Sequence, residues 1–550
     1  MSMKDYLRDV VTAACSKLGF DNAEIYFEKP KEEKFGDLST NAAFLLAKIQ
    51  KTNPRKFAEE LVSNFDYDKS IIEKIEIAGP GFINFFISDN YYKKLIPEIL
   101  DKKENYGRSE INSGKSVNLE WVSANPTGYL HAGHGRQLCL GKAIANLLEW
   151  SGYIVTREYY YNDAGNQMLN MGKSIYARYM QIFEPDFPFP EDGYHGEYIK
   201  DIARKIYGDK KDSLKNSESM DYFINAGEEY NFKLIKNTLG KMGVRHDVFF
   251  NESDLYKTGA VEKTLEEFKS KNLSYEKDGA IWLKMDETEG FQKDKVIVKS
   301  SGEPTYRLPD IAYHIDKLNR GYDIVLDIFG SDHGDTYKEV IYGVKSLGYP
   351  YKKIHVIIHQ MVTLRKGDNV IKLSKREGHS YSLDDLIDDI GADATQFFFV
   401  MRGANTHLDF DLELAKEKSE KNPVYYLQYA FARICGVLRN AENIFPEYKD
   451  FNAENINPEL IISNDEINLL KTLSLFPEEV ENAALSFEPH KIITYLNEVA
   501  EKFHKFYHNC RIIDAENKAQ SAVRLYICLA VKQTLKNGFD IIGISAPERM

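Results

Sequence analysis

The stretch that decides the fold is LEWVSANPTGYLHAGHGR, residues 119–136. Apolar residues alternate over 117–122, which predicts a strand leading into this stretch. The following SANPTG (123–128) is typical of a loop. From Leu138 onward, apolar residues recur at helical spacing. His131 and His134 therefore lie where a strand passes through a loop into a helix.

A helix start of this kind suits phosphate. Its backbone N–H groups are free and carry a partial positive charge, and the two histidines can donate hydrogen bonds to phosphate oxygens. His-x-Gly-His after a strand is typical of several kinds of nucleotidyl transferase. The alternative interpretation is a pair of helix-capping histidines in an unrelated fold, and the rest of the chain has to decide between the two.

Length and composition predict a multidomain protein without a membrane span. The chain has 550 residues, enough for three or four domains, of which 43% are hydrophobic and 28% charged. Its apolar runs stay short of the roughly 18 residues that a membrane helix needs. The five cysteines form no CxxC pair, which favours a reducing cytoplasm and argues against a structural metal site or disulfides.

The charge balance limits how the chain could bind nucleic acid. Its formal net charge is −13, so any surface that binds phosphate is confined to local patches and should bind less tightly as salt rises. The 35 tyrosines and 31 phenylalanines belong mostly to cores. Some of them could stack on bases.

Three domains follow from the periodicity. Residues 1–110 combine helices at 3–18 and 41–51 with two strand-like runs over 75–87, which predicts a small α+β module for packing or interaction. Residues 111–410 alternate strands and helices, which is typical of a parallel α/β sheet, with a polar helical insertion at about 187–254. Residues 411–550 are helical almost throughout. The strands expected in the parallel sheet are 117–122, 154–161, 280–285, 296–298, 324–329 and 354–362.

The predicted sheet places its ligand outside the carboxyl ends of the strands, at a switch point in strand order. The Gly-rich phosphate loops GxGxxG and GxxxxGK[ST] are absent from the sequence. A second segment, VIKLSKREG (370–378), could supply phosphate contacts instead, because Lys372 and Lys375 are mobile cations able to offset charge on a leaving pyrophosphate. The alternative is a solvated, charged turn.

Two acidic residues could recognise a planar cation. Glu120 lies near the end of the predicted strand before the histidine loop, and Asp310 lies in TYRLPDIAYH (305–314). Carboxylates with bidentate geometry, assisted by aromatic rings, hold a guanidinium best. Spacing alone does not bring the two residues together, and both could be ordinary acidic residues at element ends.

Taken together, these motifs resemble those of arginyl-tRNA synthetases, which are class I aminoacyl-tRNA synthetases, along essentially the whole chain. The resemblance implies a Rossmann-like catalytic core, an N-terminal domain that contacts the D-loop at the tRNA elbow, and an all-helical C-terminal bundle that binds the anticodon. The stretches that carry it are FGDLSTNAA (35–43), AGPGFINFFIS (78–88), SANPTGYLHAGHGR (123–136), YYYNDAGNQ (159–167), EDGYHGEY (191–198), TYRLPDIAYH (305–314), KLSKREG (372–378), NPVYYLQYAFAR (422–433) and APERM (546–550).

The resemblance also implies which residues bind ATP. His131 and His134 would bind its phosphates and stabilise the transition state of adenylation. Lys372 and Lys375 would support departure of pyrophosphate, with Ser374 shaping their loop. Met361 and Val362 would contact adenine, largely through their backbone, and Gly330 would also line the ATP site.

For the amino acid, the resemblance implies that Ser123 and Asn125 hold the main-chain groups of arginine. Glu120, Tyr306 and Asp310 would read its guanidinium, and His134 and His333 would also line this pocket. The residues implied at the anticodon are Tyr426, Tyr429, Arg433 and Met550. For the tyrosines of this last set, packing between helices is the alternative role.

The reaction implied is ATP-dependent attachment of L-arginine to tRNA(Arg) through an arginyl-adenylate, with Mg2+ accompanying the nucleotide and tRNA needed already for the first step. We expect a cytoplasmic monomer that binds no membrane. Two departures from the family pattern stand out. Leu373 replaces the usual Met, a near-isosteric change, and Gly334 follows His333 where relatives often carry a second histidine, which puts the roles of 330–335 in doubt.

Two rival interpretations remain. A different class I synthetase is possible, but a cysteinyl enzyme would show a set of zinc ligands that the cysteine spacing lacks. A non-catalytic RNA-binding paralogue would not need His131, His134, Lys372 and Lys375, all of which are present.

Overall fold

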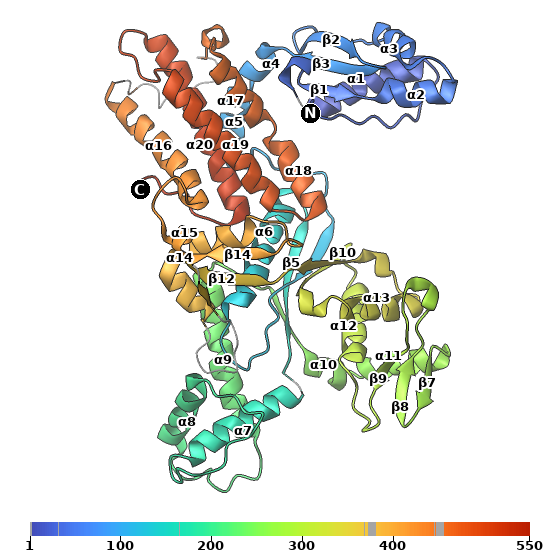
Figure 1. The fold of residues 1–550 in the computed structure, drawn as a ribbon, viewed down its shortest axis with the longest axis vertical. Coiled ribbons are helices and arrows are strands. Elements are labelled where there is room, and N and C mark those ends of the chain that lie inside the picture. Colours follow the sequence, from blue (N-terminus) through green and yellow to red (C-terminus); the bar gives the residue numbers. More distant parts are fainter. Residues whose placement is uncertain are drawn as a thin grey trace.

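A computed structural model of the chain describes residues 3–30, 32–163, 165–367, 369–371, 381–444, 446 and 456–550. An N-terminal domain stands beside a long C-terminal helical bundle, and both lie at one end of a central α/β region (Figure 1). Two smaller units, one helical and one mixed, extend from the other side of that region. Within the part of the chain that is described, no helix is both long and apolar enough to cross a membrane.

The N-terminal domain is the expected α+β module. Its three-stranded antiparallel sheet has the order β1-β3-β2, and helices pack on it. The predicted helices at 3–18 and 41–51 and the two predicted strands within 75–87 are confirmed. Its elements are α1 (Met3–Lys17), β1 (Leu38–Thr40), α2 (Ala42–Gln50), α3 (Pro54–Ser63), β2 (Ile72–Ala78) and β3 (Phe82–Ile87), and α4 (Asp89–Lys93) and α5 (Leu95–Lys102) then lead to the bundle.

A five-stranded parallel sheet with the order β11-β10-β4-β5-β6 forms the centre. From β4 the chain proceeds outward through β5 and β6, then returns to β10 on the other side of β4. The strand order therefore reverses between β4 and β10, and a ligand crevice is expected at their carboxyl ends. The strands are β4 (Ser116–Glu120), β5 (Ile154–Tyr161), β6 (Val248–Asn251), β10 (Ile324–Gly330) and β11 (Ile354–His359).

The predicted membership of the sheet was partly wrong. The runs 280–285 and 296–298 are strands, but they belong to a separate antiparallel sheet, β7 (Ser274–Lys277), β8 (Ala280–Leu283) and β9 (Lys295–Val298). A two-residue turn joins β7 to β8, and both Asp278 and Gly279 have positive φ, as a tight hairpin requires. The Asp-Gly pair was the sequence signal that should have separated these strands from a parallel sheet.

The helical insertion also has different limits from the predicted 187–254. Strand β6 lies inside that range but pairs with β5, so the insertion ends before Val248. At its start, α7 (Asn166–Met180) shares a separate hydrophobic core with α8 (Glu197–Lys210) and the beginning of α9 (Asp221–Lys241). Met171, Ile202 and Phe223 are among its fully buried side chains.

The mixed unit beside the sheet contains four helices and the sheet β7-β8-β9, and their shared core continues onto β10. Of its helices, α12 matters most for the site because His314 and Lys317, in its second half, bond to Asp327 of β10 and to Glu120 at the carboxyl end of β4. The helices are α10 (Glu252–Lys257), α11 (Ala260–Ser270), α12 (Arg307–Asn319) and α13 (Thr336–Ser346).

After the central sheet, the predicted strand 354–362 is divided: β11 ends at His359 and a new strand begins at Val362. That strand, β12 (Val362–Lys366), joins β13 (Asn369–Ile371) and β14 (Leu408–Asp411) in a small sheet with the order β13-β12-β14. Helix α14 (Leu383–Val400) packs beside it and is interrupted at Gly391, whose backbone is not helical.

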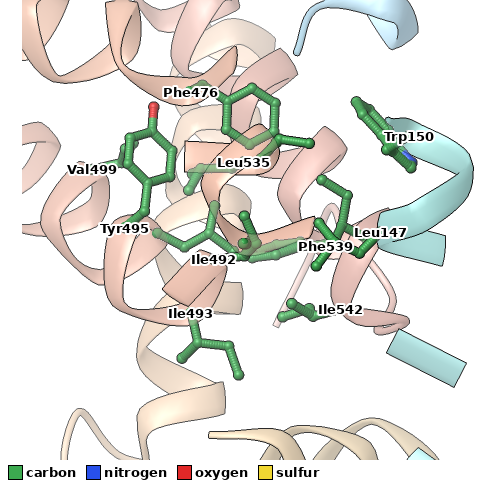
Figure 2. Close-up of a cluster of buried hydrophobic side chains, with 14 of the residues drawn as sticks. Leu147, Trp150, Phe476, Ile492, Ile493, Tyr495, Val499, Leu535, Phe539 and Ile542 are labelled. Carbon is green, nitrogen blue, oxygen red and sulfur yellow. The ribbon is translucent and has the colours of Figure 1, made fainter. Parts of the chain in front are cut away.

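The C-terminal region is helical, as predicted. Its core continues into the central α/β region, because Leu147 and Trp150 of α6 (Ala132–Trp150) pack among side chains of the bundle such as Phe476 and Phe539 (Figure 2). Lys142 of α6 also donates to the backbone carbonyls of Met242 and Gly543, each at 2.9 Å. The helices are α15 (Leu412–Lys416), α16 (Pro423–Ile444), α17 (Asn464–Ser474), α18 (Phe476–Ser486), α19 (His490–Asn509) and α20 (Lys518–Ile542).

Candidate active site

The chain turns sharply where β4 ends. Val122 and Ser123 have φ values of 72° and 39°, in the left-handed region that side chains other than glycine rarely adopt. The turn brings Ser123 back over the strand. Its hydroxyl donates to Glu120 Oε1 at 2.9 Å and accepts from the backbone N–H of Tyr160 at 3.0 Å. Backbone strain of this kind concentrates at functional sites.

The two histidines occupy the start of α6, as predicted. His131 is the residue before its first turn, and its backbone N–H donates to Nδ1 of His134 at 3.2 Å. The two rings stack with their centroids 3.7 Å apart. Because α6 is 19 residues long, its amino end carries a full helix dipole beside this ring pair.

The residues that follow the lysine-rich segment in the chain lie beside the histidine pair. Lys372, Ser374 and Lys375 lie outside the described residues. Directly after them, the backbone N–H of Leu383 donates to Leu130 O at 2.8 Å, and that of Ala132 donates to Tyr381 O at 3.3 Å. The residues that follow this segment are therefore held against the start of α6.

Glu120 and Asp310, which spacing could not bring together, lie in one acidic cluster. Helix α12 presents Asp310, Tyr313, His314 and Lys317 on one face, at helical spacings of three, four and seven residues. The ammonium of Lys317 donates to Glu120 Oε2 and, at 2.6 Å, to Asp327 Oδ1 of β10. The polar face of α12 therefore covers the carboxyl ends of β4 and β10, at the switch point.

The cluster is poised for a cation. Burial raises the pKa of the Asp310 carboxyl to about 7, and the negative charges of Glu252 and Glu120 add to this rise while His314 and Lys317 offset part of it. Burial also raises the pKa of Glu252, the first residue of α10. A guanidinium placed here would relieve this repulsion and ionise Asp310 fully.

Three residues of this cluster escaped the sequence prediction: Glu252, Asp327 and Lys317. Glu252 and Asp327 are acidic residues at or after the carboxyl half of a sheet strand, a position that could have suggested them. Lys317 had a weaker signal, because a lysine in a helical pattern is normally solvated. Only its zero exposure in the folded chain reveals a different role.

Other residues predicted to bind substrates lie outside the buried acidic cluster. The side chains of Tyr306 and Met361 are 74% and 72% exposed. The ring of His333 stacks on Phe329 with centroids 5.6 Å apart and remains largely exposed. Asn125 donates to Gln167 Oε1 at 2.7 Å. Gly330 ends β10, and Val362 begins β12 shortly after β11 ends.

Three of the predicted anticodon residues, Tyr426, Tyr429 and Arg433, lie on α16, on the side that faces α19. The guanidinium of Arg433 lies over the Tyr429 ring at 4.5 Å, and it bonds the Tyr429 hydroxyl at 2.8 Å and His504 Nδ1 at 2.9 Å. The rings of Tyr426 and His504 are 5.3 Å apart, and Met550 is 53% exposed. These contacts serve packing between the helices, yet the side chains stay partly open to solvent.

Within the part of the chain that the structure describes, no group of three or more His, Cys, Asp or Glu side chains is arranged so that it could hold a metal ion. The five cysteines are buried free thiols.

Comparison with known proteins supplies the family. The model described as "tRNA synthetases class I (R), catalytic domain" matches residues 95–401, preceded by "Arginyl tRNA synthetase N terminal domain" at 4–87 and followed by "DALR anticodon binding domain" at 427–550. This chain belongs to the arginyl-tRNA synthetase family. Its fold is accordingly that of a class I synthetase, with the parallel sheet in the catalytic domain and the helical bundle as the DALR domain.

Curated relatives in the family match along nearly their whole length. The arginine–tRNA ligase of Chlorobaculum tepidum is 44% identical, with 100% of each chain covered, and that of Shouchella clausii is 45% identical over 96% of this chain and 94% of its own. Among solved structures, a putative arginyl-tRNA synthetase from Campylobacter jejuni has a TM-score of 0.76 at 31% identity, covering 84% of this chain and 100% of its own. The Thermus thermophilus arginyl-tRNA synthetase, 20% identical, shares the fold over 100% of both chains with a TM-score of 0.75.

Proposed function

We propose that this arginyl-tRNA synthetase joins L-arginine to tRNA(Arg) in two steps, with one strand–loop–helix unit holding both small substrates. The observation that carries the proposal is that Glu120, a member of the buried acidic cluster, and the His131–His134 pair lie on the same short segment, at the switch point of the sheet. The acidic cluster suits a guanidinium, and the start of α6 suits a triphosphate.

In this proposal the amino acid lies on the strand side. Glu120 and Asp310 hold the guanidinium, with Glu252 adding negative charge nearby. Ser123 and Asn125 hold the main-chain groups of arginine. Tyr306 and His333 lie at the rim, and we propose that they close on the bound side chain.

ATP lies on the helix side. His131 and His134 donate to its phosphates, and Gly330, Met361 and Val362 flank the adenosine. Lys372 and Lys375 offset the charge of the leaving pyrophosphate, with Ser374 shaping their loop. We expect Mg2+ to enter with the triphosphate and to neutralise part of its charge when bound.

The chemistry needs no covalent intermediate with the enzyme. A carboxylate oxygen of arginine attacks the α-phosphorus, and the bond from that phosphorus to the bridging oxygen breaks, which gives arginyl-adenylate and pyrophosphate. The 2′-hydroxyl of the terminal adenosine of tRNA then attacks the activated carbonyl, loses its proton and expels AMP. The protein contributes mainly positioning and electrostatic stabilisation.

For tRNA, we propose that Tyr426, Tyr429, Arg433 and Met550 contact the anticodon while the N-terminal domain contacts the elbow. We further propose that the enzyme acts as a monomer in the cytoplasm. Each of these assignments is separate from the catalytic one, because the bundle and the N-terminal domain lie apart from the sheet's carboxyl edge (Figure 1).

The test is charging of total tRNA with each of the twenty amino acids in turn, together with ATP–pyrophosphate exchange with and without tRNA. We expect charging with arginine alone, and arginine-dependent exchange only when tRNA is present. If arginine supported neither reaction under any tRNA condition, the proposed function would be wrong.

A further inference from the structure

Lys317 is a charged side chain without access to solvent. Its relative exposure is zero, and its ammonium lies 4.3 Å from the centre of the Tyr313 ring as well as against Glu120 and Asp327. Removing an ammonium from water is unfavourable unless charged partners and hydrogen bonds compensate for the loss. The two carboxylates supply that compensation, so the three residues form one unit.

This unit fixes the position of the Glu120 carboxylate. Glu120 and Asp327 are register partners on β4 and β10, so their carboxylates would repel each other without the ammonium between them. Burial alone would raise the pKa of Asp327, but Lys317 and His314 lower it to about 2. Glu120 is held at both oxygens, by Ser123 at Oε1 and by Lys317 at Oε2, and is only 4% exposed.

We propose that Lys317 is a positioning residue for arginine recognition, which holds the Glu120 carboxylate in a single orientation so that its remaining lone pairs meet the guanidinium beside Asp310. The inference rests on the proposed function, because it assigns a role within the arginine pocket. Lys317 acts through Glu120 and has no contact of its own with substrate in this arrangement.

The main test replaces Lys317 by methionine, which keeps the length of the side chain and removes its charge, and by arginine, which keeps the charge. In tRNA-dependent exchange, Lys317→Met should raise the KM for arginine about tenfold or more, because a buried charge pair loses one partner. The KM for ATP should change less than about threefold. Lys317→Arg should restore most of the affinity for arginine.

A second readout separates positioning from folding. Lys317 lowers the pKa of Asp310, which His314, Glu252 and Glu120 also influence. In Lys317→Met, the rise of kcat/KM for arginine with pH should therefore move to higher pH, because losing a nearby positive charge makes Asp310 harder to ionise. In Lys317→Arg, kcat/KM for arginine should rise over the same pH range as in the wild type.

Lys317→Met could fold poorly because it leaves Asp327 buried without its cation. The double variant Lys317→Met/Asp327→Asn removes both charges, and we expect it to fold and still to show the raised KM for arginine. Arg524→Met is the matched control, since Arg524 forms a buried pair with Glu466 at 2.7 Å in the distant bundle. It should lower stability without changing the KM for arginine.

Outcomes of the test differ for the two proposals. A wild-type chain that does not activate arginine would overturn the proposed function and this inference with it. A wild-type chain that activates arginine, together with a folded double variant whose KM for arginine is normal, would overturn the inference alone. Equal rises in the KM for arginine and ATP would also overturn it, since they would indicate general damage to the site.

Discussion

At the scale of single residues, the surroundings of Asp310 indicate most clearly that the substrate is a cation. Burial, together with the negative charges of Glu252 and Glu120, raises the pKa of its carboxyl to about 7. A carboxyl in this state is half protonated near neutral pH and gains its full charge only when a cation arrives. Arginine binding should therefore release a proton.

This gives a pH dependence with a definite sign. The KM for arginine should fall as pH rises from about 6 to 8, because only ionised Asp310 attracts the guanidinium, and it should level off above the pKa of about 7. Steady-state exchange assays across this range check it. Asp310→Asn should make the KM for arginine nearly independent of pH over this range. If the KM of this variant changed with pH as it does in the wild type, Asp310 would not be the group that titrates.

The same substitution tests the pocket at constant pH. Asp310→Asn should raise the KM for arginine about thirtyfold or more while leaving the KM for ATP nearly unchanged, because a charged hydrogen bond to the guanidinium is lost. Asp316→Asn is the control on the same helix, since Asp316 pairs with Arg320 at 3.0 Å. Equal effects of Asp310→Asn on both substrates would contradict the assignment.

At the scale of elements, α6 connects the proposed ATP side of the site with the bundle. Its first turn carries the histidine pair, its middle packs under Trp121, and its last turns share the core of the bundle (Figure 2). Gly141 is needed at the middle contact, because a Cβ there would lie 2.2 Å from the Trp121 ring. Trp121 directly follows Glu120, so this contact also supports the strand end.

Gly141→Ala should therefore lower the free energy of unfolding by about 1–3 kcal/mol through overpacking, and it should also raise the KM for arginine. Thermal or urea unfolding together with exchange assays measures both effects. The control is Gly208→Ala in α8, where an added Cβ meets nothing within 4 Å; that change should stabilise by about 0.5–1 kcal/mol. If Gly141→Ala changed neither the free energy of unfolding nor the KM for arginine, the Trp121 indole must be able to move aside.

Helix α16 offers a test of the tRNA face. Arg433→Met keeps much of the side chain's apolar bulk against Tyr429 and Tyr507 but removes the guanidinium. If Arg433 contacts tRNA, the KM for tRNA should rise about fivefold or more, as expected for a lost charged contact, while the KM for ATP stays constant. A drop in melting temperature with an unchanged KM for tRNA would favour the packing role.

At the scale of the whole molecule, the three domains of the family are joined by contacts that reach across the chain. Lys4 pairs with Glu478 at 2.5 Å and Asp37 with Lys471 at 2.9 Å, so the N-terminal domain is held against the bundle. Asn537 of α20 donates to the carbonyls of Lys103 and Tyr106, each at 2.9 Å. The surfaces proposed to bind the tRNA elbow and the anticodon therefore belong to two domains that contact each other directly.

The net charge of −13 leads to a prediction about salt. Contacts with tRNA phosphates must come from local cationic patches and should weaken through counterion release, so the KM for tRNA should rise at least about tenfold between roughly 50 and 200 mM salt. The KM for arginine should change far less, because buried pairs are screened weakly. Similar salt dependence for both substrates would contradict a buried arginine pocket.

The arrangement of these elements was only partly predictable. The strand before residue 120, the helix after His131, the α+β module and the C-terminal helices follow from local periodicity and were confirmed. The runs at 280–285 and 296–298 were correctly identified as strands but assigned to the wrong sheet. Periodicity reports which face of a segment is apolar, whereas the partner of a strand depends on residues far away in the chain.

By itself, the sequence determined that a histidine pair stands at a strand–loop–helix junction, because turn residues and apolar spacing act over a few neighbouring positions. Only the tertiary structure decided that Glu120, Asp310 and Glu252 share one cluster and that Lys317 is buried among carboxylates. These residues converge through the pairing of β4 with β10 and the packing of α12. Their charges depend on burial, which exists only once distant segments exclude water from the same space.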